Sequence, residues 1–92
     1  MNVFTKGSFD RDVASISDGV LLVALKSKIS QLELAPEKSH ITGLKLLRGY
    51  NTHYRIKVIT VSASFRIGTI IRGNSIWLVR FLPRKKIYKH FP

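Results

Sequence analysis

Basic side chains alternate with apolar ones in two segments of the C-terminal half. Arg55 and Lys57 alternate with the apolar residues of segment 54–58, and Arg66 lies between two apolar residues in segment 65–68. Successive side chains of a β-strand point to opposite faces of a sheet. If the two segments are paired strands, the three basic residues form a cluster on one face, opposite the apolar residues.

These residue types suit chemistry at a phosphate. An arginine guanidinium stays ionised and matches phosphate oxygens in pairs, so Arg55, Arg66 and Arg84 could hold a phosphate and the charge that develops on it. Proton transfer needs a second kind of group, for which Lys57 and Tyr88 are the candidates. The alternatives for proton transfer are His53 and His90.

The charge distribution indicates a polyanionic partner. The formal net charge of the chain is +11. Residues 1–37 contribute a net charge of −1, whereas residues 38–92 contain twelve Lys or Arg and no Asp or Glu. Nucleic acid is favoured over a membrane, because the bases do not lie on one face of an amphipathic helix. Seven further residues of this half are expected to bind RNA around the site: Arg48, Arg72, Arg80, Lys85, Lys86, Lys89 and His90.

The composition argues against several other classes of protein. The chain has no cysteine, which leaves no thiolate zinc site and no cysteine nucleophile. The basic half offers no carboxylate for a hard cation, so a metal-free reaction with no cofactor is expected: attack of an RNA 2′-hydroxyl on its adjacent phosphate. The length of 92 residues suits a single domain over residues 1–92. A cytoplasmic location is expected, because the apolar runs are too short to cross a bilayer.

The N-terminal half predicts a short strand and two helices. After a strand at residues 2–5, Ser8 is expected to cap a helix, with Asp10 and Asp12 in its first turn. Asp18 is expected to cap a longer helix that Pro36 ends. Each helix carries an apolar stripe, formed in the first by Phe9, Val13 and Ile16 and in the second by Leu22, Leu25, Ile29 and Leu32.

The C-terminal half predicts three antiparallel strands, at about 54–61, 65–72 and 75–82, after a loop over 37–43. Gly73 and Asn74 form a two-residue hairpin turn, and Pro83 ends the last strand. The fold class is therefore α+β, β-α-α-β-β-β, with two N-terminal helices packed on one face of a small, mainly antiparallel sheet. The opposite face is expected to stay free and to be locally bare at Gly68, with the short helical tail 84–90 folding over the basic cluster.

Several short motifs occur in a fixed order: 46–50 (LLRGY), 54–58 (YRIKV), 65–68 (FRIG) and 79–88 (VRFLPRKKIY). Together with the helix start at 9–12 and the closing Phe91-Pro92, this pattern resembles the RelE-type toxins of bacterial toxin-antitoxin systems. The resemblance implies a microbial-ribonuclease-like fold. It also implies metal-independent cleavage of mRNA in the ribosomal A site, and a cognate antitoxin, which we expect to be acidic or partly disordered.

The resemblance also implies roles for particular residues. The family's basic pair falls on Arg55 and Lys57, its strand arginine on Arg66, the arginine after the last strand on Arg84, and its C-terminal tyrosine on Tyr88. Many members have a histidine where Pro83 stands. One branch has a glutamate on the first of the three C-terminal strands, and that glutamate is absent here. A lysine-dependent or tyrosine-dependent variant is therefore implied. The alternatives are a ParE-type toxin, which shares the fold and poisons DNA gyrase, and a basic RNA-binding protein without activity.

Overall fold

A computed structural model describes residues 1–92, and its central feature is a five-stranded sheet with the order β1-β5-β4-β3-β2. The strands are β1 (Asn2–Thr5), β2 (Leu44–Leu46), β3 (His53–Ile59), β4 (Ser64–Arg72) and β5 (Ser75–Pro83). β1 runs parallel to β5, and the other neighbours are antiparallel. The predicted α+β class is confirmed, with β2 as an additional edge strand at residues 44–46, where no strand was predicted.

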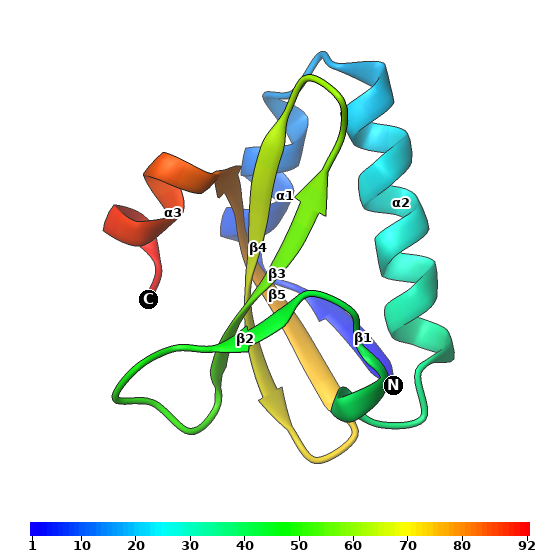
Figure 1. Ribbon diagram of the computed structural model, residues 1–92, viewed down its shortest axis with the longest axis vertical. Coiled ribbons are helices and arrows are strands. Elements are labelled where there is room, and N and C mark those ends of the chain that lie inside the picture. Colours follow the sequence, from blue (N-terminus) through cyan, green and yellow to red (C-terminus); the bar gives the residue numbers. More distant parts are fainter.

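Helices α1 (Gly7–Ala14) and α2 (Gly19–Leu34) cover one face of the sheet, called the inner face below (Figure 1). The main core lies between these helices and the sheet, and it includes residues such as Phe9, Leu25, Ile56 and Phe81. This arrangement follows from the alternation in the strands, because alternate apolar residues of β3, β4 and β5, such as Ile56, Ile67 and Phe81, point to the inner face. None of the helices is long and apolar enough to cross a membrane.

The helix ends agree with the sequence in one case and differ in the other. Asp18 caps α2, since its Oδ1 accepts a hydrogen bond of 3.1 Å from the backbone N–H of Leu21. The predicted cap of α1 by Ser8 is wrong. The cap position is Lys6. Ser8 is already within the helix, and its hydroxyl donates a hydrogen bond to the carbonyl of Val79 on β5. A hydroxyl that can reach a neighbouring strand need not satisfy its own helix end.

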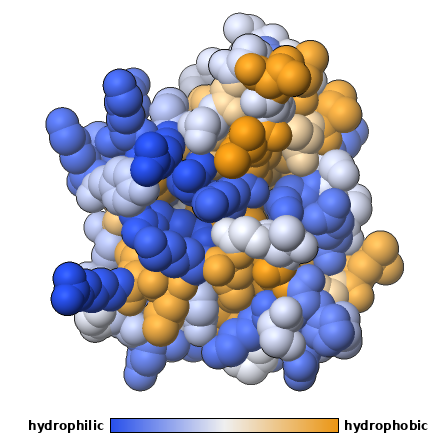
Figure 2. All heavy atoms as spheres, in the orientation of Figure 1, coloured by the Kyte–Doolittle hydropathy of each residue, from blue (hydrophilic) through white to orange (hydrophobic).

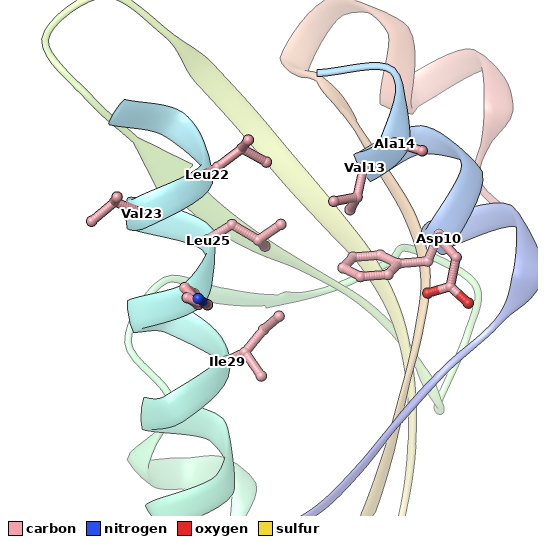
Figure 3. Close-up of a pocket in the computed structure, with 9 residues that line it drawn as sticks. Asp10, Val13, Ala14, Leu22, Val23, Leu25 and Ile29 are labelled. Carbon is pink, nitrogen blue, oxygen red and sulfur yellow. The ribbon is translucent and has the colours of Figure 1, made fainter. Parts of the chain in front are cut away.

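The stripe on α2 is shifted from the predicted one. Leu21, Leu25 and Leu32 are the buried residues of this helix, while Leu22 and Ile29 are only half-buried. Leu22 and Ile29 instead point towards Val13 of α1 and line an open groove between α1 and α2 (Figure 3). The groove encloses about 540 Å³ and contains seven hydrophobic residues among the nine that line it. Its apolar lining makes it unsuitable for phosphate.

The opposite, outer face of the sheet is only partly open. Helix α3 (Arg84–His90) directly follows β5 and folds back over this face, so that it lies on the side of the sheet opposite α2 (Figure 1). Ile87 and Phe91 are buried there together with Leu47 and form a second, smaller core with Val79 and Leu82. The expectation that the tail folds over this face is confirmed, but the expectation that the rest of the face is free is wrong in its central part.

Gly68 shows how closely the C-terminal segment is docked. We expected Gly68 to leave the face bare, but the ring of Phe91 lies directly on its backbone. A Cβ atom at residue 68 would be 2.5 Å from Cγ of Phe91. The absence of a side chain at this position therefore serves to admit an aromatic ring from the tail.

Candidate phosphate-binding and active site

A small cavity on the outer face brings the predicted catalytic residues together. It encloses about 170 Å³. Its lining includes all five residues selected from the sequence and two that were not: Gly43, Lys45, Arg55, Lys57, Arg66, Arg84 and Tyr88. The cavity thus joins β2, β3, β4 and α3, and no acidic side chain lines it.

The register of the strands places the basic residues side by side. Lys57 of β3 pairs with Arg66 of β4, and Arg55 pairs with Gly68 on one side and with Lys45 of β2 on the other. Directly opposed residues have Cβ atoms about 5 Å apart on the same face. Like charges at this separation repel, so an anion between them would relieve the repulsion.

Arg66 is the most deeply placed of these cations, with 8% of its surface exposed. Its Nη1 donates to the carbonyl of Phe65 at 3.0 Å and to the hydroxyl of Ser64 at 3.2 Å, which orient the guanidinium. Burial lowers the pKa of Arg66, and the charges of Arg84 and Arg55 lower it further against the opposing influence of Tyr88. A guanidinium still keeps its proton at neutral pH, so Arg66 is a fixed and poorly solvated positive charge.

Tyr88 lies above the strand residues and faces the cations. The centre of its ring is 4.3 Å from Cζ of Arg55, a cation-π contact that orients the ring. The pKa of Tyr88 lies below its ordinary value of 10.0, chiefly because Arg84 stabilises the phenolate, with smaller contributions from Arg55 and Arg66. At a given pH a larger fraction of such a tyrosine is ionised than of an unperturbed one, and the phenolate is the form that accepts a proton.

The position of α3 explains why Arg84 and Tyr88 reach the cavity. They lie one helical turn apart, at i and i+4, on the same face of the helix. Ile87, on another face, is fully buried and anchors the helix to the sheet. Phe91 fixes the chain after the helix against Gly68. The site therefore depends on two apolar anchors in the tail.

The residues predicted to bind RNA outside the cavity are distributed unevenly. Lys85, Lys86, Lys89 and His90 are exposed on α3, and hydrophilic side chains gather over that helix in Figure 2. Arg48 is exposed in the turn after β2. Arg72 is exposed at the other end of β4, about 20 Å from Arg66 at 3.3 Å per residue.

Arg80 is the exception among them. Asp12 of α1 accepts hydrogen bonds from Nε of Arg80 at 2.8 Å and from Nη2 at 3.1 Å, so this guanidinium is held within the fold. Asp12 also accepts a bond of 2.9 Å from the backbone N–H of Phe81. The contact between Arg80 and Asp12 depends on an irregularity in the β4–β5 register. Gly68 pairs with Arg80 but Thr69 pairs with Leu78, so one residue of β5 is skipped and Arg80 turns towards α1.

Lys45 and Gly43 are the parts of the cavity that sequence reasoning missed. The segment 44–46 is apolar-basic-apolar, which is the alternation of a strand, but three residues give a weak signal. Gly43 has a φ of +78°, and a Cβ there would be 3.3 Å from Cβ of Lys57. Of the alternatives for proton transfer, His53 lies on β3 outside the cavity lining and His90 lies at the exposed end of α3.

The chain is similar to known proteins both in sequence and in fold. No protein-family model matches the chain. A stretch of 49 residues is 41% identical to Toxin RelE3 of Methanocaldococcus jannaschii. This match covers 53% of the chain and spans about half, 51%, of that curated relative.

The fold comparison covers almost the whole chain. The crystal structure of the RelB-RelE antitoxin-toxin complex from Methanococcus jannaschii contains a chain that superposes with a TM-score of 0.73 and 27% sequence identity. The superposition covers 97% of this chain and 99% of that one. In sequence over about half of its length, and in fold over nearly all of it, this chain is therefore similar to RelE toxins, the resemblance that the order of its motifs predicted.

Proposed function

We propose that this chain is the toxin component of a type II toxin-antitoxin system and a metal-independent endoribonuclease that cleaves mRNA, with the ribosomal A site as its place of action. The observation that carries this proposal is the cavity on the outer face. It combines five basic residues with a tyrosine of lowered pKa and includes no carboxylate. Simple phosphate binding would require the cations but not the tyrosine.

The proposed reaction is an attack of a ribose 2′-hydroxyl on the adjacent phosphorus. The 2′-oxygen forms a bond to phosphorus, its proton passes to a base, and the bond from phosphorus to the 5′-oxygen breaks. The products are a 2′,3′-cyclic phosphate and a 5′-hydroxyl, the latter protonated by an acid of the site. No water and no oxidant is consumed in this step.

The roles of the residues follow from their surroundings. Arg66 and Arg84 stabilise the negative charge that develops on the phosphate, because cations that are already in place do this at the least cost of reorganisation, and Arg66 is also buried. Tyr88 as phenolate is the favoured base, and Lys57, paired with Arg66 across the strands, is the favoured acid, since an ammonium group starts with a proton to give. Arg55 orients the Tyr88 ring and contacts the phosphate backbone.

The partner that neutralises such a toxin is proposed to be an antitoxin with acidic, partly disordered segments. Residues 38–92 have no acid of their own, and a negatively charged segment over the cavity would compete directly with RNA. Docking through charge alone predicts that the complex weakens as the salt concentration rises.

The test is cleavage of mRNA on programmed ribosomes by purified protein. Arg66→Ala should reduce the cleavage rate by at least about a hundredfold, the size of effect seen when one charge-stabilising donor is removed from an active site. Lys26→Ala is the matched control, because Lys26 is exposed on α2 and lines the groove rather than the cavity. Its removal should leave the rate unchanged.

Two results would contradict the proposal. Cleavage by Arg66→Ala at the wild-type rate would remove this cavity from the reaction. Absence of cleavage by the wild-type protein, combined with inhibition of gyrase supercoiling, would instead indicate a ParE-type activity.

A further inference from the structure

Aromatic and apolar side chains form a row across the outer face, beside the cavity and outside it. His53 pairs with Ile70, Ile70 pairs with Trp77, and Trp77 pairs with Phe4. Paired residues share a face, so one side chain from each of β3, β4, β5 and β1 lies in this line. Tyr50 extends it beyond β3, with its ring centre 4.8 Å from that of His53. These five residues are called the aromatic row.

The rings of the aromatic row are already held in place by their neighbours. Phe4 and Trp77 are stacked, with ring centres 5.6 Å apart and planes 24° apart. The ring of Phe91, which is buried against Gly68, has its centre 5.8 Å from that of His53. The hydroxyl of Thr52 lies 3.0 Å from Nδ1 of His53, which fixes the orientation of the imidazole. A surface that is organised before binding loses little conformational entropy when a ligand arrives.

The aromatic row is nevertheless accessible. Phe4 is 48% exposed and Tyr50 is 45% exposed, while His53, Ile70 and Trp77 are half-buried. Neither α1 nor α2 covers this face, and α3 packs on its central part through Ile87 and Phe91. Connected apolar side chains that no element of the fold covers mark a surface for binding.

The charges around the aromatic row decide what it binds. Arg72 lies two residues beyond Ile70 on the same face of β4. Arg55 and Lys57 follow His53 at alternate positions of β3, so the row continues directly into the cationic cavity with about 7 Å between successive side chains. No acidic residue occurs between residues 38 and 92. Aromatic rings beside a cationic track are the arrangement by which proteins bind single-stranded nucleic acid without reading its sequence.

We propose that the aromatic row stacks the unpaired bases of single-stranded RNA next to the phosphate held in the cavity. The proposal deepens the proposed function, because it assigns the binding site of the nucleotides that flank the cleaved bond. The nearest base would stack on His53 and Tyr50, and further bases would lie towards Trp77 and Phe4. Since every base has a flat face, this subsite would favour unpaired RNA over a duplex without selecting a sequence.

The chain contains an intrinsic reporter for this proposal, because Trp77 is its only tryptophan. Short single-stranded RNA with 2′-O-methyl groups lacks the attacking 2′-hydroxyl and cannot be cleaved by this reaction, so binding is measured apart from catalysis. We expect titration with this RNA to quench the fluorescence of Trp77. RNA of the same length without bases should bind through its phosphates and leave the fluorescence unchanged. Equal emission in the presence and absence of the RNA with bases, at concentrations that saturate binding, would overturn the proposal.

Variants separate stacking from charge. Loss of one stacked base corresponds to at least about a fivefold weaker Kd, so Tyr50→Leu should raise the Kd by this factor or more, and Tyr50→Phe should restore it. The dependence of the Kd on salt should not change in Tyr50→Leu, because no phosphate contact is lost. Lys57→Ala should instead reduce the slope of log K against log salt by about 0.7. Tyr50 is exposed in a turn, so its replacement does not disturb the core.

The outcome is independent of whether the protein cleaves RNA. If the wild-type protein cleaves nothing but Tyr50→Leu weakens RNA binding as stated, the proposed catalytic function fails and the stacking site stands. If cleavage is confirmed but Tyr50→Leu binds RNA as tightly as the wild type, the stacking site fails alone. Unchanged RNA binding together with weaker binding of the antitoxin would assign the aromatic row to a protein partner and overturn the proposal.

Discussion

Replacement of Gly68 by alanine tests whether the C-terminal tail assembles the site. The added Cβ would lie 2.5, 2.7 and 2.8 Å from Cγ, Cδ2 and Cδ1 of Phe91. Carbon atoms in contact prefer about 3.5 to 4.0 Å, so the ring must move by roughly 1 Å. Phe91 is only 5% exposed and packs against Leu47 and Ile87, so the movement disturbs the second core.

The size of the effect can be bounded. Overpacking of a well-packed site costs about 1 to 3 kcal/mol, and complete loss of a buried phenylalanine side chain costs about 3 to 5 kcal/mol. Alanine is favoured over glycine in a strand by about 0.5 to 1 kcal/mol, which offsets part of this cost. We therefore expect Gly68→Ala to lower the free energy of unfolding by about 1 to 2 kcal/mol and the Tm by about 5 to 15 °C.

Urea denaturation of four proteins measures the contact: the wild type, Gly68→Ala, Phe91→Ala and the double variant. Without the Phe91 ring, Gly68→Ala should be neutral or slightly stabilising, which gives a clear coupling energy between the two positions. Gly19→Ala is the control, because a Cβ at residue 19 has no atom within 4 Å and a helix favours alanine. Additive effects of Gly68→Ala and Phe91→Ala would refute the close contact. So would a Gly68→Ala protein as stable as the wild type.

Two further predictions concern titratable groups. Asp12→Ala should lower the free energy of unfolding by about 2 to 3 kcal/mol at pH 7, because Arg80 and the Phe81 N–H lose their acceptor. Burial alone would raise the pKa of Asp12, but these bonds lower it below 3.8, so its contribution is present above that pH and is lost as the pH falls through the folded pKa. Urea denaturation at pH 7 and pH 3 should show the difference between the two proteins shrinking, and an equal difference at both would contradict this. The cleavage rate should rise with pH to an inflection below 10.0, and Tyr88→Phe should remove that inflection, whereas an unchanged profile would exclude Tyr88 as the base.

Much of the candidate site was predictable because strand parity is a local property. Arg55, Lys57 and Arg66 share a face for the same reason that Ile56 and Ile67 share the core, and one hydrophobic pattern determines both. The hairpin at Gly73 and Asn74 pairs Arg72 with Ser75, as a two-residue turn requires. The helical propensity of the tail and the stop at Pro36 were equally local signals.

The remainder depends on contacts between distant parts of the chain. The ring of Phe91 over Gly68 and the Ser8 bond to Val79 have no signature in their own segments. Asp12 suited a helix start, but its bond to Arg80 depends on an irregularity in the β4–β5 register that only the assembled sheet reveals. Lys45 was missed because a three-residue edge strand becomes evident only when β3 is there to pair with it.

The chemical nature of the RNA ends is the most direct test of the proposed reaction. Ribosome-bound mRNA is incubated with the protein, and the ends of the fragments are identified. We predict cleavage with a 2′,3′-cyclic phosphate on the upstream fragment and a 5′-hydroxyl on the downstream one. A 3′-hydroxyl with a 5′-phosphate would contradict attack by the 2′-hydroxyl and, with it, the roles assigned to Arg66, Arg84 and Tyr88.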